Sequence, residues 1–574
     1  MRLAKSPLLD EALPAWRARL VMGLLMAGSA ALVARAVWLQ GINKEFLIGQ
    51  GESRYERVIA MPATRGRILD RHGDVLAIST PVKSVWAIPE DARLSPAQTR
   101  ELAKLLETDA RELARRLAAE RDFVFLKRRI PPDLAERIAA LKLPGIHFQD
   151  EYRRYYPSGE VTAHMLGFTG AEDVGQEGIE LAMEAQLAGK PGSRRVIKDR
   201  LGRIVEDVES IRAPQDGKDV VLALDAKLQY LAYSRLKQAL HEHKAKAGGI
   251  VMLDARSGEV LALVNLPAYN PNSRAKLSGA QLRNRAFTDT FEPGSTFKPF
   301  GVALALEKGL VRVDTTVQTA PGRLTINGAT ISDAHKHELL SVAQVIQKSS
   351  NVGTAKIALG LPAEDMWSMF ASLGFGEPLK LGFPGEAGGR LRPWKRWRPI
   401  EQATMSYGHG ISVTLIQLAR AYLAFARDGD LLPLSLARAE AAPTVGTRVF
   451  SAQTAREMRT MLEMAVQPGG TAPKAQVPGY RVAGKTGTAH KLEGGRYADK
   501  YISSFVGFAP VSDPRLIVAV MIDEPSGGIY YGGQVAAPVF AGVMSSALRS
   551  LGVAPDDTPR PLQVADAAAP REAM

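Results

Sequence analysis

The chain has 574 residues, no cysteine and a formal net charge of +13, from 73 basic and 60 acidic side chains. Without cysteine it can form no disulfide, use no thiolate nucleophile and bind no metal through sulfur. With 46% hydrophobic and 23% charged residues, its composition excludes a disordered, fibrous or many-span membrane protein. The length predicts several domains of about 150 residues each. The positive charge favours an anionic partner without identifying it.

Residues 20–40 are apolar apart from Ser29, Arg35 and Gln40. A helix of about 21 residues rises about 31 Å, close to the thickness of a bilayer hydrocarbon core. The basic residues that precede this stretch predict a cytoplasmic N-terminus at residues 1–19 and export of the remainder. We therefore predict a signal anchor at residues 20–40, with a cleaved signal peptide as the alternative. Export makes nucleic acid an unexpected partner.

The elements after the anchor indicate a mixture of helices and strands. Residues 95–120 carry leucines at the spacing of amphipathic helices. Residues 220–224 predict a buried strand, and residues 227–243 predict a helix with its leucines inward. The pattern of residues 249–265 predicts two strands joined by a turn at 254–258. Together these elements predict a mixed α/β module at 41–217, a larger module at 218–550 and a disordered tail at 551–574.

The most informative local feature is Glu292-Pro293-Gly294-Ser295-Thr296-Phe297-Lys298-Pro299-Phe300. Its Pro-Gly pair predicts a turn, after which Ser295 opens a helix. A serine there lies in the positive field of the helix N-terminus, which favours an alkoxide and then an oxyanion. Lys298 is one turn further on and can take the hydroxyl proton if burial and neighbouring cations keep it neutral. From these residues alone, Ser295 is either a nucleophile or only a helix N-cap.

A second Ser-x-x-Lys pair, Ser273 and Lys276, falls in a loop-like stretch with no helix behind it. Because such pairs arise by chance about once in a chain of this length, the spacing alone does not select between the two.

Two later segments carry the polar groups that a serine nucleophile needs. Ser349-Ser350-Asn351 falls between helical stretches and presents a hydroxyl and an amide to the lysine and to a substrate peptide. A polar pair between two helices is the alternative for this segment. Lys485-Thr486-Gly487-Thr488 falls on a predicted strand at 481–490, beside a second predicted strand at 501–509.

Each residue of this second segment has an expected contribution. Lys485 supplies a cation, and Gly487 leaves room for a substrate backbone against the strand edge. Thr488 offers a hydroxyl and an N–H near a substrate carboxylate and the developing oxyanion.

The ordered set Ser-x-x-Lys, Ser-x-Asn and Lys-Thr-Gly is the signature of the penicillin-recognising serine enzymes. Ser350 stands where the class A β-lactamases have an aspartate. Over roughly residues 15–550 the chain also resembles the class B penicillin-binding proteins of the cell-division type, often called FtsI. Outside the three motifs, the segments that carry this resemblance are residues 65–73, 154–157, 175–180, 347–351 and 531–538.

The resemblance implies an α+β fold. Residues 218–550 would form a transpeptidase domain with an antiparallel sheet between helices. Residues 41–217 would form a pedestal of the dimerisation type. The implied activity is that of a peptidoglycan D,D-transpeptidase, which acts on stem peptides ending in D-Ala-D-Ala and is the target of β-lactam antibiotics. No metal or other cofactor is implied.

The same resemblance implies a role for each residue of the motifs. Ser295 is the nucleophile, and Lys298 is its general base. Ser349 relays the proton of the leaving group, and Asn351 orients the substrate amide. Lys485 supplies electrostatic stabilisation. Substrate binding and the oxyanion hole are implied for Thr486, Gly487 and Thr488.

The resemblance also implies a location and partners. The protein would be anchored in the inner membrane with its catalytic domain in the periplasm, at the division septum. Because the first module has no obvious acidic catalytic pair, a separate FtsW-type glycosyltransferase is implied, together with other divisome proteins. Two further functions stay open, namely a non-catalytic β-lactam sensor and a hydrolase of the D,D-carboxypeptidase or β-lactamase type.

Several other patterns are weaker. Residues 479–486 match the phosphate-binding pattern G-x-x-x-x-G-K-T, but neither a strand before it nor a helix after it is predicted. Residues 390–398 hold five basic residues and two tryptophans, which predict a solvated loop that packs its rings, or else a surface for a partner or a glycan. Residues 407–410 predict a tight loop near the site, in which His409 is a secondary candidate for a base.

Overall fold

The computed structural model describes residues 15–44, 56–119, 121, 123–198, 204–274, 277–440 and 446–557. The chain forms two compact units, each assembled from separate segments. The first unit takes the described parts of residues 1–63, 83–151 and 189–216, and the second takes those of 64–82, 152–188 and 217–574. The units therefore do not follow the single predicted boundary between residues 217 and 218, which stays a prediction.

The first unit begins with a long apolar helix. Helix α1 (Ala15–Val37) continues into a π-helical turn (Trp38–Ile42). Within the described part of the chain, this is the one helix long and apolar enough to cross a membrane, with a mean hydropathy of 1.9 in its most apolar window. It contains the predicted span at 20–40 and starts earlier, because the alanine, arginine and leucine residues before it also favour helix.

Two further groups of elements belong to the first unit. One is an antiparallel sheet of β1 (Glu56–Met61), β6 (Gly192–Lys198) and β7 (Ile204–Arg212), with β6 in the middle. The other combines the end of β3 (Val75–Ala87), the strand β4 (Val124–Ile130) and the first part of β5 (Ile146–Tyr155) with three helices, α3 (Pro96–Leu105), α4 (Ala110–Leu117) and α5 (Pro132–Ala140).

The helices predicted in residues 95–120 are confirmed. Ser95 caps the start of α3, and Asp109 caps the start of α4. Leu102, Leu106 and Leu113 are fully buried between the two helices and the neighbouring strands. The chain breaks into two helices because Asp109 offers its carboxylate to the first N–H groups of α4.

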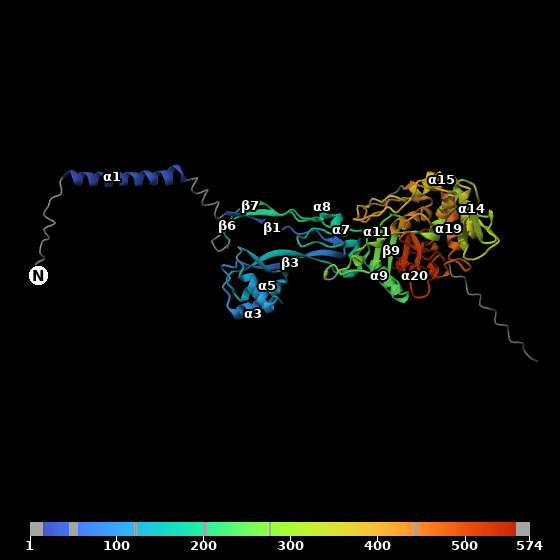
Figure 1. Ribbon diagram of the computed structural model, residues 1–574, viewed down its shortest axis with the longest axis horizontal. Coiled ribbons are helices and arrows are strands. Elements are labelled where there is room, and N and C mark those ends of the chain that lie inside the picture. Colours follow the sequence, from blue (N-terminus) through green and yellow to red (C-terminus); the bar gives the residue numbers. More distant parts are fainter. Residues whose placement is uncertain are drawn as a thin grey trace, which may run out of the picture. The chain divides into compact units, whose positions relative to one another are not determined.

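The second unit is built on a five-stranded antiparallel sheet (Figure 1). The order of its strands is β10 (Val260–Leu266), β9 (Ala247–Asp254), β21 (Leu516–Asp523), β20 (Arg496–Ala509) and β19 (Ala483–Glu493). The two strands predicted in residues 249–265 and the pair predicted at 481–490 and 501–509 are confirmed. Strand β19 lies at one edge of this sheet.

Helices cover both faces of this sheet. Helices α9 (Ala226–Glu242) and α20 (Gly532–Ser550) pack on one face, and α17 (Leu415–Ala421) packs on the other. Ile250 packs in the hydrophobic core on the side of α9 and α20, and its neighbour Val251 packs in the core on the side of α17. Because both faces are dry, β9 is buried throughout and does not alternate with polar residues. The predicted antiparallel sheet between helices is confirmed.

The remaining elements of the second unit surround this sheet. Strand β2 and three short helices precede strand β8 (Val220–Val221), and a set of helices and two-stranded sheets follows β10. They are β2 (Ile68–Leu69), α6 (Ala163–Leu166), α7 (Gly178–Ala182), α8 (Glu184–Leu187), α10 (Gly279–Leu282), α11 (Arg285–Thr288), β11 (Thr290–Phe291), α12 (Lys298–Glu307), β12 (Thr316–Gln318), β13 (Arg323–Ile326), β14 (Ala329–Ser332), β15 (Leu339–Ser341), α13 (Val342–Lys348), α14 (Asn351–Leu359), α15 (Ala363–Ser372), α16 (Pro399–Met405), β16 (Val413–Thr414), α18 (Leu423–Ala426), β17 (Asp430–Leu431), β18 (Thr447–Arg448) and α19 (Ala452–Met464).

A buried ion triad joins three distant segments of the second unit. The Glu180 carboxylate accepts hydrogen bonds from Arg65 Nε and from Arg154 Nε, each at 2.7 Å. All three side chains are almost completely buried. Buried charges are tolerated when they are paired in this way, so the triad fixes these segments to one another. Three of the segments that carried the resemblance in the first predicted module therefore meet here.

The start of the predicted disordered tail is part of the fold. The Tyr480 hydroxyl donates to the Val553 backbone oxygen at 2.7 Å, and the Asp556 carboxylate accepts from the Arg481 N–H at 2.7 Å. These contacts are tertiary and leave no periodic signal in the sequence. Residues 558–574 of the predicted tail and residues 1–14 of the predicted cytoplasmic segment lie outside the described residues.

Candidate active site

Ser295 lies in a single 3₁₀ turn (Gly294–Phe297) that leads directly into α12. The N-cap of the turn is Pro293, so Ser295 does not act as a capping residue. The Thr296 hydroxyl donates to the Pro293 backbone oxygen at 2.7 Å and fixes the turn. Ser295 itself is half-buried. The predicted helix start is confirmed, with a tighter first turn than expected.

Lys298 is completely buried behind this turn. Its Nζ donates to the Ser349 hydroxyl at 3.0 Å and to the Ser349 backbone oxygen. Burial holds the pKa of Lys298 well below its usual range, and the positive charge of Lys485 lowers it further. The Asp333 carboxylate opposes this shift. The lowered pKa makes Lys298 a candidate proton acceptor.

Ser349 joins two helices in a strained backbone conformation. It ends α13 with φ of 60° and ψ of 41°, the left-handed region that a residue with a side chain rarely adopts. Ser350 then caps α14, because its hydroxyl accepts the Gly353 N–H at 2.9 Å. The strained corner turns both the hydroxyl and the carbonyl of Ser349 toward Lys298. Such strain concentrates at functional sites, where the surrounding structure holds it.

Asp333 holds this corner in place, and sequence analysis missed it. Its carboxylate accepts from the Ser350 hydroxyl at 2.7 Å, from the Val352 N–H at 3.0 Å and from the Asn351 N–H. A carboxylate at a helix N-terminus is stabilised by the exposed N–H groups and by the helix dipole. The Asn351 side chain donates to the Ser332 backbone oxygen at 2.8 Å, so the same segment orients the predicted amide.

Strand β19 brings a second buried lysine to the same place. Lys485 is fully buried, and burial lowers its pKa to about 7. Its Nζ donates to the Thr486 hydroxyl at 3.2 Å, and that hydroxyl lies 3.1 Å from the Thr471 hydroxyl. Because the charge of Lys485 acts on Lys298, the two predicted lysines share one site.

Gly487 is required for a different reason from the predicted one. A Cβ atom at this position would lie 2.3 Å from Ser504 Oγ and 2.8 Å from the Pro293 backbone oxygen. The missing side chain therefore faces the interior and the turn that carries Ser295, not the space where a substrate backbone was expected to lie. The glycine lets β19 approach that turn closely. The prediction that the missing side chain leaves room for a substrate backbone is therefore wrong.

Thr488 is already engaged by the protein. Its hydroxyl accepts the Gly532 N–H at the start of α20, at 2.9 Å, and keeps its own proton available to donate. On the other side of the strand, a Cβ at Gly294 would lie 3.4 Å from the Thr488 backbone oxygen. The backbone of the turn that holds Ser295 therefore lies against the backbone of β19 at Thr488.

The structure therefore assembles the predicted site residues. Lys298 and Ser349 are joined by a hydrogen bond, and the charge of Lys485 lowers the pKa of Lys298. Residues 486–488 of β19 lie beside the turn that holds Ser295. Among the described residues, no hydrogen bond joins the Ser295 hydroxyl to Lys298 in this state. Apo sites often show such bonds only once a substrate is bound.

The other weighed patterns are resolved as follows. Lys485 and Thr486 lie within a strand and not at a helix start, which confirms the prediction that residues 479–486 are not followed by the helix of a phosphate-binding loop. Residues 390–398 form a loop with one 3₁₀ turn, in which Trp397 Nε1 donates to the Arg392 backbone oxygen at 2.9 Å. Lys276 of the second Ser-x-x-Lys pair lies outside the described residues.

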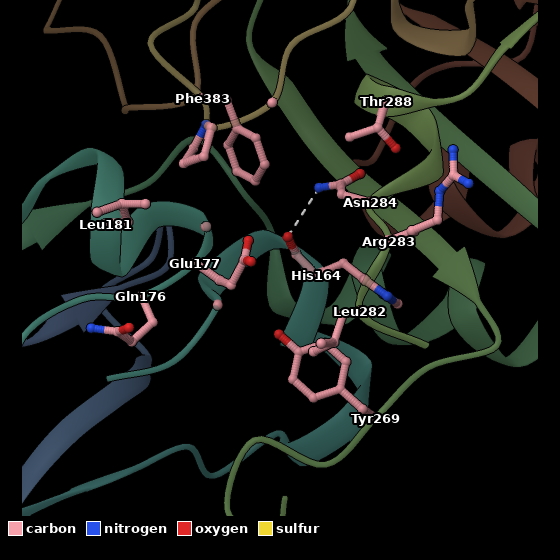
Figure 2. A pocket seen from close by; sticks show the side chains of 14 residues that line it. His164, Gln176, Glu177, Leu181, Tyr269, Leu282, Arg283, Asn284, Thr288 and Phe383 are labelled. Carbon is pink, nitrogen blue, oxygen red and sulfur yellow. Dashed lines mark hydrogen bonds between the residues drawn. The ribbon is translucent and has the colours of Figure 1, made fainter. Parts of the chain in front are cut away.

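A cavity of about 360 Å³ lies elsewhere in the second unit. Figure 2 shows Glu177, Tyr269 and Phe383 on its wall, beside the hydrogen bond from the Asn284 amide to the His164 backbone oxygen. None of the predicted site residues lines it. This cavity is therefore distinct from the site at Ser295.

An antiparallel sheet between helices, with a serine at a helix start and a Lys-Thr-Gly strand beside it, defines the penicillin-recognising class of serine proteins. Comparison with known proteins places the chain within that class. Residues 248–545 match the family model of the penicillin binding protein transpeptidase domain, and residues 60–222 match that of the penicillin-binding protein dimerisation domain. The chain belongs to the penicillin-binding protein transpeptidase family.

Relatives of nearly full length support this assignment. A protein of Neisseria gonorrhoeae named probable peptidoglycan D,D-transpeptidase PenA is 46% identical over 532 residues, which cover 92% of this chain and 91% of the relative. The peptidoglycan D,D-transpeptidase FtsI of Escherichia coli K12 is 42% identical over 549 residues, 94% of this chain and 93% of the relative. The apo transpeptidase domain of Burkholderia pseudomallei penicillin-binding protein 3 is 51% identical with a TM-score of 0.55, covering 59% of this chain and 98% of that one.

Proposed function

We propose that the protein is a peptidoglycan D,D-transpeptidase that cross-links stem peptides through an acyl-enzyme on Ser295. The observation that carries this proposal is the buried Lys298, whose lowered pKa and bond to Ser349 suit it to accept the serine proton. The names of the relatives support the same activity. β-Lactams would acylate Ser295 because they resemble the D-Ala-D-Ala end of the substrate.

The first half-reaction forms the acyl-enzyme. Neutral Lys298 takes the proton of Ser295, whose Oγ attacks the carbonyl between the two D-alanines. The positive charge of Lys485 and the start of α12 favour the developing negative charge. The C–N bond then breaks, and the proton passes from Lys298 through the Ser349 hydroxyl to the departing D-alanine nitrogen. Lys298 is neutral again at the end of this step.

The substrate lies along the edge strand β19 in this proposal. An edge strand presents unpaired backbone groups to which an extended peptide can bond. The backbone N–H groups of Ser295 and Thr488 form the oxyanion hole. The close approach of the backbone at Gly294 to that at Thr488 supports this assignment. The hydroxyls of Thr486 and Thr488 receive the substrate carboxylate, Gly487 lets the strand reach the turn, and Asn351 orients the substrate amide.

We also propose where the protein works. Helix α1 would anchor it in the inner membrane, with the basic N-terminal segment in the cytoplasm and the chain that follows the helix in the periplasm. The similarity to a relative named FtsI supports a role in septum formation. An FtsW-type glycosyltransferase and other divisome proteins would then be its partners. The predicted pedestal at 41–217 and transpeptidase domain at 218–550 remain our proposed division of the chain.

The test measures both products of the reaction. Full-length protein in detergent is incubated with a D-Ala-D-Ala stem peptide and an acceptor stem peptide, and released D-alanine and cross-linked dimer are quantified by mass spectrometry. We expect both products, with both lost in Ser295→Ala and retained in Ser273→Ala, the serine of the second Ser-x-x-Lys pair. D-Alanine release without dimer would instead indicate a carboxypeptidase, and neither product would contradict the proposal.

A further inference from the structure

A carboxylate, an imidazole and a phenol lie together beside Ser295, and acylation uses none of them. Glu292 Oε1 accepts the Gly410 N–H at 2.8 Å, and Glu292 Oε2 lies 3.1 Å from the Tyr497 hydroxyl that donates to it. His409 Nδ1 lies 3.7 Å from the same Oε2 atom. Three elements converge here, namely the segment before the 3₁₀ turn, the loop at 407–410 and strand β20.

This cluster is joined to the nucleophile through the backbone. A Cβ at Gly408 would lie 2.3 Å from the Gly294 backbone oxygen, so only glycine permits the contact, and Gly408 has a φ of 84°. Gly294 N–H also donates to the Gly408 oxygen at 3.4 Å. Gly294 directly precedes Ser295 and Gly408 directly precedes His409. The predicted tight loop near the site is therefore confirmed, and its backbone packs against the residue that precedes Ser295.

The surroundings of His409 keep its imidazole neutral. Burial lowers the pKa of His409, and the Glu292 carboxylate opposes this shift. The side chain nevertheless keeps 31% of its surface exposed, so it can reach a ligand. With Nδ1 directed to the carboxylate, Nε2 is the ring nitrogen left for a substrate.

The remaining groups near the ring do not compete for its proton. Tyr407 and Tyr497 pack against His409 with ring centroids 5.2 and 6.0 Å away, and burial raises the pKa of both phenols, so they stay protonated. Arg392 lies beside the loop but is paired with Glu401 at 2.7 Å.

The second half-reaction needs a proton acceptor that the first does not. An acceptor amine with a lysine-like pKa of about 10.4 arrives as an ammonium ion and cannot attack a carbonyl until it loses a proton. Lys298 is needed for a later proton, because the nitrogen must lose a second one when the amide forms. A separate base close to Ser295 would meet the first requirement.

We propose that His409 is this base and that Glu292 is the positioning residue that orients its ring. The proposal rests on the proposed transpeptidase function and deepens it. In this proposal the acceptor amine enters as a cation toward the Glu292 carboxylate. A base oriented by a carboxylate is the general arrangement of catalytic histidines.

The step balances as follows. His409 Nε2 takes one proton from the acceptor ammonium, and the neutral amine attacks the acyl carbonyl of Ser295. Lys298 takes the second nitrogen proton as the C–N bond forms, and it returns this proton to Ser295 Oγ as the C–O bond breaks. The imidazolium of His409, stabilised by Glu292, then releases its proton to water.

The test separates the two half-reactions in the full-length protein in detergent. Acylation is followed with benzylpenicillin, and aminolysis is followed with a D-alanine thioester donor and either D-alanine or hydroxylamine as acceptor. We expect His409→Gln to leave the acylation rate within about twofold and to reduce aminolysis by D-alanine by about 100-fold. Hydroxylamine is largely unprotonated at neutral pH, so the loss should largely disappear with that acceptor.

Two further variants and a control sharpen the result. Glu292→Gln removes the charge that raises the pKa of His409, so the ascending limb of aminolysis against pH should move to lower pH. His409→Tyr keeps a polar ring without the base and should lose aminolysis as His409→Gln does. His241→Gln, at the exposed end of α9, is the matched control and should change neither rate.

Each outcome decides the question. Equal losses with D-alanine and hydroxylamine, or no loss with either, would overturn the role of His409, and an unmoved pH limb in Glu292→Gln would overturn that of Glu292. If the wild-type protein itself forms no acyl-enzyme with penicillin, the proposed function fails instead, and this is visible before any acceptor is added.

Discussion

Replacement of Asp333 by alanine should weaken both the fold around Ser349 and the acylation rate. The carboxylate accepts three hydrogen bonds at the start of α14, from the Ser350 hydroxyl and from two backbone N–H groups. Loss of a helix cap costs about 1 kcal/mol, and loss of a charged acceptor to a hydroxyl costs about 1.5 kcal/mol more. We therefore expect a loss of about 2–3 kcal/mol, or about 2–4 °C in Tm for a unit of this size.

The effect on acylation should exceed the effect on stability. Without its anchor, the strained Ser349 relaxes away from Lys298, and a shift of about 1 Å at a catalytic group can cost about 100-fold in rate. Thermal unfolding of the full chain and stopped-flow acylation by a fluorescent penicillin measure the two effects. Asp333→Asn keeps one oxygen acceptor and should give an intermediate result. An unchanged Tm and an unchanged acylation rate in Asp333→Ala would refute this account of the corner.

Three further outcomes are expected. In Lys485→Gln, the ascending limb of acylation against pH should move to higher pH, because the positive charge that lowers the pKa of Lys298 is gone; rapid-quench acylation between pH 5 and 10 measures it, and a shift to lower pH would contradict this sign. Gly487→Ala should reduce acylation at least tenfold by pushing β19 off the Ser295 turn, with Gly533→Ala, at another glycine close to backbone, as a comparison for general strain. Deletion of residues 15–42 should move the protein from the membrane to the soluble fraction on cell fractionation, whereas continued membrane association would argue against α1 as the anchor.

Sequence patterns were sufficient for elements whose signal is local. The apolar helix at the N-terminus, the strands of residues 249–265 and the turn before Ser295 each depend on neighbours a few residues away. The site motifs were also recognisable because each has a fixed internal spacing. Local patterns therefore predicted individual strands of the main sheet, the two lysines and the serine corner between helices, whereas the antiparallel sheet itself was implied by the family resemblance.

Long-range partners left no such signal. Asp333 contacts Ser350, which is 17 residues away in the sequence, and Arg65 contacts Glu180, which is 115 residues away. The reason for Gly487 was misjudged because the atoms that exclude its side chain belong to Ser504 and Pro293, on other elements. No sequence pattern links Glu292 to His409 either, because the backbone contact between Gly294 and Gly408 brings the two side chains together. Only tertiary packing defines these features.

The most direct test of the central claim is intact-mass spectrometry of the full-length protein after incubation with benzylpenicillin. The account predicts one covalent adduct of one drug mass, located by peptide mapping on Ser295, absent in Ser295→Ala and retained in Ser273→Ala. A persistent adduct is expected because water is not the natural acceptor. An adduct that survives Ser295→Ala, or its absence from correctly folded wild-type protein, would contradict the assignment of Ser295 as the nucleophile.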